Sequence, residues 1–348
     1  MRKLKYLLTI AVLLTVFGRV YAAEDGAQTT FNPQEAIFEH LGDEYGWKIW
    51  NLEIPLPVII ADQSGRLHLF SSHRLRNGAE YEGFHIATEG NNSGKVVGTD
   101  ATGNEYRPWD FSITKNVLAL IICALAMCWA IFPLVRWYKK NPYGAPRKVP
   151  GMMEVVVDML YKELILEILG KDAKRYAPYL LTLFFFILFS NLLGLIVVFP
   201  GGANIMGNIA ITMVLAVCTF VVVNVSGTKE YWREIFWPDV PTWLKFPIPM
   251  MPVIELFGVF TKPMALMIRL FANMLGGHLI TLVLISLIFM FSAMGAVVTG
   301  ATTVVAVVFA IFMNLIDLLI CFIQAYVFMM LSTIFISLAR VKKHEVSE

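Results

Sequence analysis

The stretch KPMALMIRLFANMLGGH, residues 262–278, decides how this chain folds. It lies inside a long apolar segment, about residues 252–291, and Arg269 falls near the middle of that segment. An arginine at the centre of a membrane helix costs about 2.5–3.5 kcal/mol on insertion scales. A chain that keeps such a residue usually aims the guanidinium at a partner, a water-filled cavity or a moving charge.

Helical spacing gives this segment two different polar faces. One series recurs every seven residues and returns to nearly the same face, at about 100° per residue: Glu255, Lys262, Arg269 and Gly276. Asn273 follows Arg269 by four residues and joins that face, whereas His278 lies about half a turn away. One face is therefore predicted to carry charge and small residues, and the opposite face a titratable imidazole.

The composition is that of a polytopic membrane protein. Of the 348 residues, 57% are hydrophobic and only 16% are charged, whereas about a quarter are charged in a soluble domain. Several apolar runs reach the roughly twenty residues that cross a bilayer core of about 30 Å. All four cysteines lie in apolar runs, which points to no disulfide framework and no thiolate metal site.

The N-terminal part is predicted to be exported. Residues 1–23 have the positive start, apolar core and small cleavage-site residues of a signal peptide; an uncleaved first span is the alternative. Residues 24–110 are polar and predict a small, partly β domain outside the inner membrane. Residues 47–54 alternate as one strand does, and Val58–Ile60, the turn Asp62–Gly65 and Leu67–Phe70 predict a hairpin.

Residues 111–348 are predicted to form an all-α membrane domain with five spans. The spans cover about residues 117–135, 177–199, 209–225, 252–291 and 303–339, with an outer turn at 200–204. A basic cluster follows the first span and another ends the chain, so both lie on the cytoplasmic side. Residues 152–175 are amphipathic and too charged to span, so we expect them to lie along the cytoplasmic interface.

The last two apolar stretches are longer than a bilayer is thick. At 1.5 Å per residue each would exceed about 50 Å if it were continuously helical. Ordinary tilts reach about 40° in a core of about 30 Å. Either both helices are unusually steeply tilted, or Pro263 and the glycines break them; we favour a steeply tilted hairpin.

The final stretch supplies a second polar set: Asn314, Asp317 and Gln324. An aspartate inside the membrane needs a partner, and Arg269, Lys262 and His278 are the candidates. If the two long helices are antiparallel neighbours, Asp317 and His278 fall at similar depth and predict a vestibule open to the outside. Gln324 would approach the level of Arg269, and an Arg269–Gln324 pair is predicted at mid-depth. The alternative is a static ion pair, such as Asp317 with Arg269, that only locks the helices together.

The sequence lacks the motifs of the common enzyme classes. It has no phosphate-cradling glycine loop and no hydrolase or metalloprotease motif. We therefore expect no nucleotide site, no catalytic residue and no cofactor or metal in this chain. The basic cluster after the first span is a topology signal, so a nucleic-acid partner is not expected.

Taken together, these residues resemble subunit a of the F-type ATP synthase membrane sector. The resemblance rests on Glu255, Lys262-Pro263, the run Arg269-Leu-Phe-Ala-Asn-Met, Gly276-Gly-His278 and Gln324-Ala-Tyr-Val-Phe, and it covers about residues 112–340. Many members place an acid where His278 stands and a histidine where Asp317 stands, so the two types are exchanged here. Residues 24–110 extend beyond the family's usual short outer N-terminus.

The resemblance implies an ion-translocating stator subunit of a bacterial inner membrane. Its partners would be a ring of c subunits with membrane-embedded carboxylates, b-type peripheral stalk subunits, the rest of the ATP synthase and the lipid bilayer. The ion is expected to be a proton. Arg269 would be the essential charge between two offset half-channels. The other implied site residues are Asn273 and Gln324 as its positioning groups, His278 and Asp317 in the outer path, Glu255 towards the inner path, and Gly276 and Gly277 for close approach of the rotor.

Two other classes of protein remain open on these residues. One is an autonomous transporter or channel in which Arg269 binds an anionic substrate. The other is a structural or receptor membrane protein whose charges only hold helices together.

Overall fold

The protein is described here by a computed structural model. It describes residues 43–49, 52–62, 64–87, 92, 94–99, 105–141, 144, 146, 149–196, 204–236, 250–292 and 296–340. All of these belong to one compact unit, Glu39–Glu348. The predicted signal peptide and residues 200–203 of the predicted outer turn lie outside the described residues.

Residues 43–110 form small antiparallel sheets, as the polar N-terminal composition predicted. The strands are β1 Gly46–Ile49, β2 Leu52–Pro55, β3 Pro57–Ala61, β4 Leu67–Ser71, β5 Phe84–Ile86, β6 Val96–Thr99, β7 Glu105–Tyr106 and β8 Trp109–Asp110, with a 3₁₀ turn at Ser72–Gly78. They pair in the orders β1-β2, β4-β3-β8 and β5-β6-β7. Val58, Ile60 and Phe70 belong to the buried core of this region.

The predicted hairpin is confirmed, whereas the single strand over residues 47–54 is wrong. Strands β3 and β4 pair with Val58 opposite Phe70. Residues 47–54 form two strands, because β1 pairs antiparallel with β2 and Trp47 lies opposite Ile54. Alternation continues through both strands, and the stretch has Asn51 but no glycine or proline before Pro55 to signal a turn.

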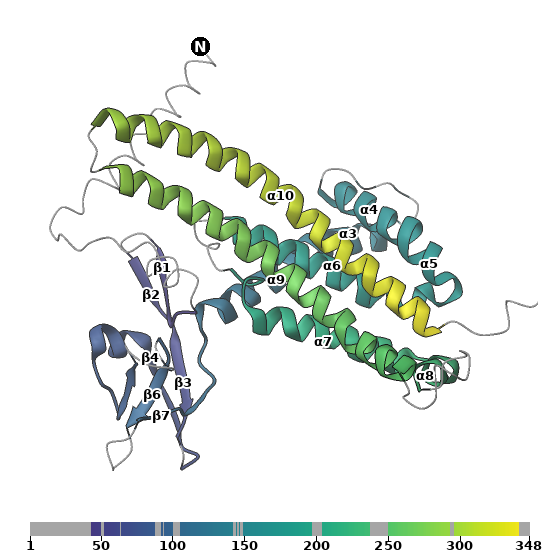
Figure 1. Ribbon diagram of the computed structural model, residues 1–348, viewed down its shortest axis with the longest axis horizontal. Coiled ribbons are helices and arrows are strands. Elements are labelled where there is room, and N and C mark those ends of the chain that lie inside the picture. Colours follow the sequence, from purple (N-terminus) through teal and green to yellow (C-terminus); the bar gives the residue numbers. More distant parts are fainter. Residues whose placement is uncertain are drawn as a thin grey trace, which may run out of the picture. The chain divides into compact units, whose positions relative to one another are not determined.

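The remaining elements are helical (Figure 1). They are α3 Lys115–Lys140, α4 Val149–Met159, a π-helical segment Leu160–Leu166, α5 Glu167–Leu169, a 3₁₀ turn Gly170–Asp172, α6 Ala173–Leu195, α7 Ile209–Ser226, α8 Lys229–Phe236, α9 Met250–Ser292 and α10 Ala296–Arg340. Within the described part, five helical stretches are long and apolar enough to cross a membrane, as predicted. The second of them joins the predicted amphipathic segment to α6.

Several of the predicted span boundaries are displaced. Helix α6 begins at Ala173 and reaches Leu195, about four residues earlier at each end than the predicted span. Its first turn keeps Lys174 and Arg175 exposed, so a charged start is compatible with the helix. Helix α10 begins at Ala296, seven residues before the predicted start, because helix continues through Gly300 and the threonines that follow.

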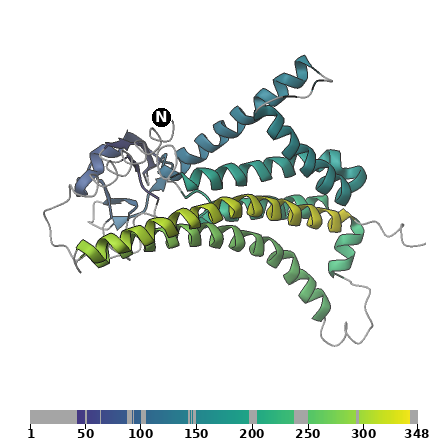
Figure 2. The same cartoon turned by 90° about the horizontal axis from the view of Figure 1, so that it is seen from above.

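Helices α9 and α10 are unbroken, so the alternative in which Pro263 and the glycines interrupt them is wrong. Pro263 lies within the 43-residue helix α9, and α10 has 45 residues. The two run side by side in opposite directions (Figure 1), and both bow along their length (Figure 2). At 1.5 Å per residue, each is roughly 65 Å long. The predicted steep tilt in the membrane stays a prediction.

Helix α6 forms the centre of the helical core. Its buried residues Leu180, Phe184 and Ile187 belong to one cluster with Leu266 and Leu270 of α9. The C-terminal half of helix α10 contributes four buried residues to the same cluster: Ala325, Phe328, Met329 and Ile336.

Polar contacts fix the C-terminal end of α10. Arg340 Nε donates to Asp172 Oδ2 at 2.7 Å, and Ser337 Oγ donates to the Ile168 carbonyl at 3.2 Å. The Thr228 amide donates to the Ala339 carbonyl at 2.9 Å. This anchoring holds the end of α10 against α5, the turn that precedes α6, and the α7–α8 corner.

Candidate functional site

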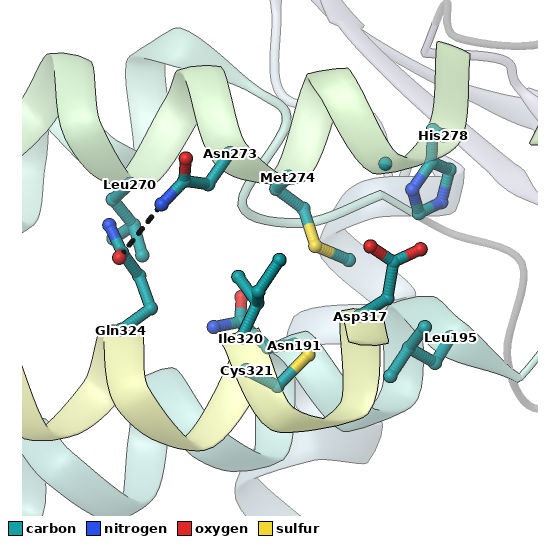
Figure 3. Close-up of a pocket in the computed structure, with 11 residues that line it drawn as sticks. Asn191, Leu195, Leu270, Asn273, Met274, His278, Asp317, Ile320, Cys321 and Gln324 are labelled. Atoms are coloured by element: carbon teal, nitrogen blue, oxygen red, sulfur yellow. Dashed lines mark hydrogen bonds between the residues drawn. The ribbon is translucent and has the colours of Figure 1, made fainter. Parts of the chain in front are cut away.

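A small pocket whose lining includes several polar side chains lies where α6, α9 and α10 meet (Figure 3). It is lined by Asn191 and Leu195 of α6, by Leu270, Asn273, Met274, Gly277 and His278 of α9, and by Asp317, Ile320, Cys321 and Gln324 of α10. It has about 20 Å³ of water-accessible space, which is enough for a water molecule. Asn191 Oδ1 is buried and has no hydrogen-bond partner within the described part of the chain, so the pocket offers an acceptor to such a water.

The pocket brings together the two residues predicted to share a depth. His278 and Asp317 point toward one another across the pocket (Figure 3). A Cβ built on Gly277 would lie 3.0 Å from Asp317 Oδ1 and 3.1 Å from Oδ2. The bare backbone at Gly277 therefore gives the carboxylate its place beside α9. Two titratable groups, an imidazole and a carboxyl, thus line one pocket.

A second polar contact joins α9 and α10 about two turns further towards the C-terminus of α10. Asn273 Nδ2 donates to Gln324 Oε1 at 2.9 Å, and Gln324 is 5% exposed (Figure 3). The predicted pairing of Gln324 with Arg269 is therefore wrong, because Asn273 takes that position. Asn273 lies one helical turn beyond Arg269 on nearly the same face, so an error of one turn in estimated depth exchanges the two.

Arg269 lies outside this network. Its side chain is exposed, and it makes no hydrogen bond or ion pair with any residue in the described part of the chain. The alternative of a static Asp317–Arg269 ion pair is thus not seen either. Arg269 presents a full positive charge on the surface of a helix of membrane length.

The other members of the seven-residue series lie towards the N-terminal end of α9. The Lys262 ammonium lies 5.8 Å from the centre of the Phe335 ring, and Glu255 is half-buried. Burial raises the pKa of Tyr231 on α8, and the negative charge of Glu255 raises it further. Gly276 faces open space, since a Cβ there would meet nothing within 4 Å.

A second pocket lies at that end of the helices, and sequence reasoning missed it. Asn224, Tyr231, Lys262 and Phe335 are among its lining residues. Asn224 Nδ2 donates to the Phe220 carbonyl at 2.7 Å, while its Oδ1 is buried without a partner in the described part. An asparagine near the end of an apolar span was the available signal. No group of three or more histidine, cysteine, aspartate or glutamate side chains in the described residues is placed to hold a metal.

Five candidate spans and a polar pocket between two long paired helices define a multi-pass membrane protein. Residues 117–337 match the family model for the ATP synthase A chain, and residues 36–111 match a model for a domain of unknown function. ATP synthase subunit a of Chloroherpeton thalassium is 38% identical over 238 residues, which are 68% of each chain. Subunit a of Myxococcus xanthus is 38% identical over 246 residues, 68% of this chain and 75% of the relative.

This chain belongs to the ATP synthase A chain family. The resemblance drawn from the run around Arg269 is thereby confirmed. Membership makes the chain one of the membrane subunits of the synthase and not one of its catalytic subunits, as predicted.

Proposed function

We propose that this chain carries protons through the membrane sector of an ATP synthase, with Arg269 as the fixed charge between two offset half-channels. The observation that supports this most directly is that the guanidinium of Arg269 is exposed and has no hydrogen-bond or ion-pair partner among the described residues. Inserting an arginine at the centre of a membrane helix costs about 2.5–3.5 kcal/mol, so an uncompensated arginine there needs a counter-charge. The described residues supply none, and we infer that a ring of c subunits with membrane carboxylates brings such a counter-charge past Arg269 repeatedly.

The outer half-channel is proposed to run through the pocket of His278 and Asp317. Both side chains bind and release protons, and the orphaned Asn191 Oδ1 offers a place for water beside them. The exchange of acid and histidine relative to many family members leaves the same two chemical groups facing each other. Asn273 and Gln324, joined by their hydrogen bond, would hold the wall of this path beside Arg269.

The inner half-channel is proposed to open at the other end of α9, near Glu255. Gly276 leaves open space on the helix surface and would allow close approach of the rotor. The predicted role of Gly277 changes, because it faces Asp317 and would instead support the outer path. We further propose that the chain lies in a bacterial inner membrane, with residues 24–110 outside and the C-terminus in the cytoplasm. Its further partners would be b-type stalk subunits.

Replacing Arg269 by alanine tests the proposal. We expect ATP synthesis driven by a proton gradient to be lost while the complex still assembles, since Arg269 is exposed and makes no hydrogen bond or ion pair with a described residue. The matched control is Ile268→Ala, the exposed neighbour on the same turn, which should keep activity. Misassembly of the Arg269→Ala complex would indicate a structural role. Solute transport by the purified chain alone would favour an autonomous transporter.

A further inference from the structure

The three-stranded sheet β4-β3-β8 has two apolar faces, and only one of them is covered by the domain. Val58, Ile60 and Phe70 turn into the buried core. On the other face, large apolar side chains are largely exposed: Leu67 by 71%, Leu69 by 72%, Trp109 by 75% and, just after β8, Phe111 by 62%.

Strand register gathers these side chains into one surface. Leu67 lies opposite Ala61, and Ala61 lies opposite Trp109. Leu69 lies opposite Ile59, whose carbonyl accepts the Phe111 amide at 2.9 Å. Directly opposite residues of antiparallel strands point to the same face. We call this surface the exposed sheet face: Ile59, Ala61, Leu67, Leu69, Trp109 and Phe111.

An exposed sheet face of this kind indicates a binding partner. Antiparallel sheets with one wet side normally alternate apolar inside with polar outside. A contiguous exposed apolar patch on a soluble domain marks an interaction with a protein or a membrane. Which of the two applies is decided by what adjoins the patch.

The exposed sheet face is tied directly to a membrane span. After Phe111, the Ile113 amide donates to the Pro57 carbonyl at 3.2 Å, and the Lys115 amide donates to the Glu44 carbonyl at 2.9 Å. Lys115 is the first residue of α3. At about 3.3 Å per residue, Phe111 therefore lies within roughly 13 Å of the start of the span. These hydrogen bonds hold the sheet close to the membrane surface.

Composition and charge at the edges of the face also fit a lipid surface. Tryptophan, phenylalanine and leucine partition into the interface between headgroups and acyl chains. Arg66 precedes Leu67 and Arg107 precedes Trp109; both arginines are exposed and have no ion pair within the described part. The nearby carboxylates are occupied by tyrosine hydroxyls, because Asp62 accepts from the Tyr106 hydroxyl and Asp110 from the Tyr45 hydroxyl. The two free guanidinium groups complement lipid phosphates.

We propose that the exposed sheet face lies on the lipid surface at the side of the membrane where α3 begins, with Trp109, Phe111 and the two leucines in the interface and Arg66 and Arg107 at the phosphates. This gives residues 36–111, a domain of unknown function, a membrane-binding role. The proposal is independent of the ion path.

The test places a photo-crosslinking amino acid, p-benzoylphenylalanine, at Leu69 of the full chain in vesicles of phosphatidylethanolamine and phosphatidylglycerol. Leu125, exposed on α3, is the lipid-facing reference, and Glu80, exposed in the same small domain, is the aqueous reference. After irradiation, mass spectrometry should find lipid adducts at Leu69 close to the yield at Leu125 and several-fold above that at Glu80. A yield at Leu69 equal to that at Glu80 would overturn the proposal. So would protein adducts, either with a second copy or with another subunit of the assembled synthase.

A second measurement tests the charge complementarity. The double variant Arg66→Gln/Arg107→Gln keeps the apolar residues and should lower the lipid adduct yield at Leu69 several-fold in vesicles that contain phosphatidylglycerol. In pure phosphatidylcholine the variant and the parent should give similar yields. An unchanged yield in the anionic vesicles would remove the two arginines from the proposal.

Discussion

The adjacent glycines Gly276 and Gly277 have opposite surroundings. A Cβ on Gly277 would press on the Asp317 carboxylate at 3.0–3.2 Å, whereas a Cβ on Gly276 would meet nothing within 4 Å. Gly276→Ala should therefore gain up to about 1 kcal/mol of helix propensity. Gly277→Ala should lose that gain, because Asp317 sits on a packed helix and must shift.

The comparison is made on purified chains unfolded in mixed detergent micelles. We expect the free energy of unfolding of Gly277→Ala to lie about 1 kcal/mol or more below that of Gly276→Ala. Equal values would mean that Asp317 moves aside freely. Under the proposed function, Gly277→Ala should also slow proton conduction, since it displaces one of the two titratable groups of the outer path.

At this scale the sequence predicted the chemistry of the site better than its pairings. A charged or amide side chain in an apolar span is costly, so Arg269, Asp317 and Gln324 stand out without any structure. Which side chains meet depends on how far one helix slides along another, and one turn of error decides between Arg269 and Asn273. The pocket residue Cys321 gave no signal, because cysteine in a membrane span usually serves as a small apolar residue.

Among the elements, β4 is joined to the turn before β5 by a surface hydrogen bond. His68 Nδ1 and Glu82 Oε2 are 2.6 Å apart, and this hydrogen bond is the main cause that lowers the pKa of Glu82. A carboxyl with a lowered native pKa stabilises the fold above its ordinary value, about 4.3, and loses that contribution as pH falls through the native value.

Glu82→Gln should therefore weaken the contact of β4 with β5 near neutral pH and have no such effect in acid, where the parent carboxyl is already protonated. Amide hydrogen exchange of the two strands in the full chain is the measurement. Glu80→Gln removes a charge from the same loop without touching His68 and is the control. A Glu82→Gln effect that persists below the native pKa would show that charge is not its cause.

Element boundaries were predictable where composition changes sharply and not elsewhere. The span at residues 209–225 matches α7 because polar residues flank it at both ends. Residues 47–54 were predicted as one strand because the alternation of side chains continues without a break from β1 into β2. Pro263 leaves α9 unbroken because the helix tolerates a missing amide with a bend, and neighbouring helices hold it in place.

For the whole molecule, five spans have one consequence for topology. If all five candidate spans of the described residues cross the membrane, we expect their odd number to place the β domain and the C-terminus on opposite sides. We expect an epitope tag inserted after Glu80 to be accessible in spheroplasts, whose outer membrane has been removed, and a tag after Glu348 only after the spheroplasts are lysed. A tag inserted between Gly227 and Thr228 should behave as the C-terminal one does. Both end tags on the same side would require an even number of spans.

Helix α10 is packed very unevenly along its length. Its C-terminal half is buried against α6, with Ala325 and Met329 fully enclosed, whereas Val304, Ile311 and Leu315 in its N-terminal half are mostly exposed. Lipid tails are as apolar as leucine, so an exposed apolar side chain in a bilayer is constrained only to remain apolar. Side-chain volume is constrained at Ala325 and Met329 by close packing. Substitutions in this one helix are thus constrained in two ways. In its N-terminal half a new side chain needs only to be hydrophobic, whereas in the C-terminal half, which supports the site, it must also match the shape of the residue it replaces.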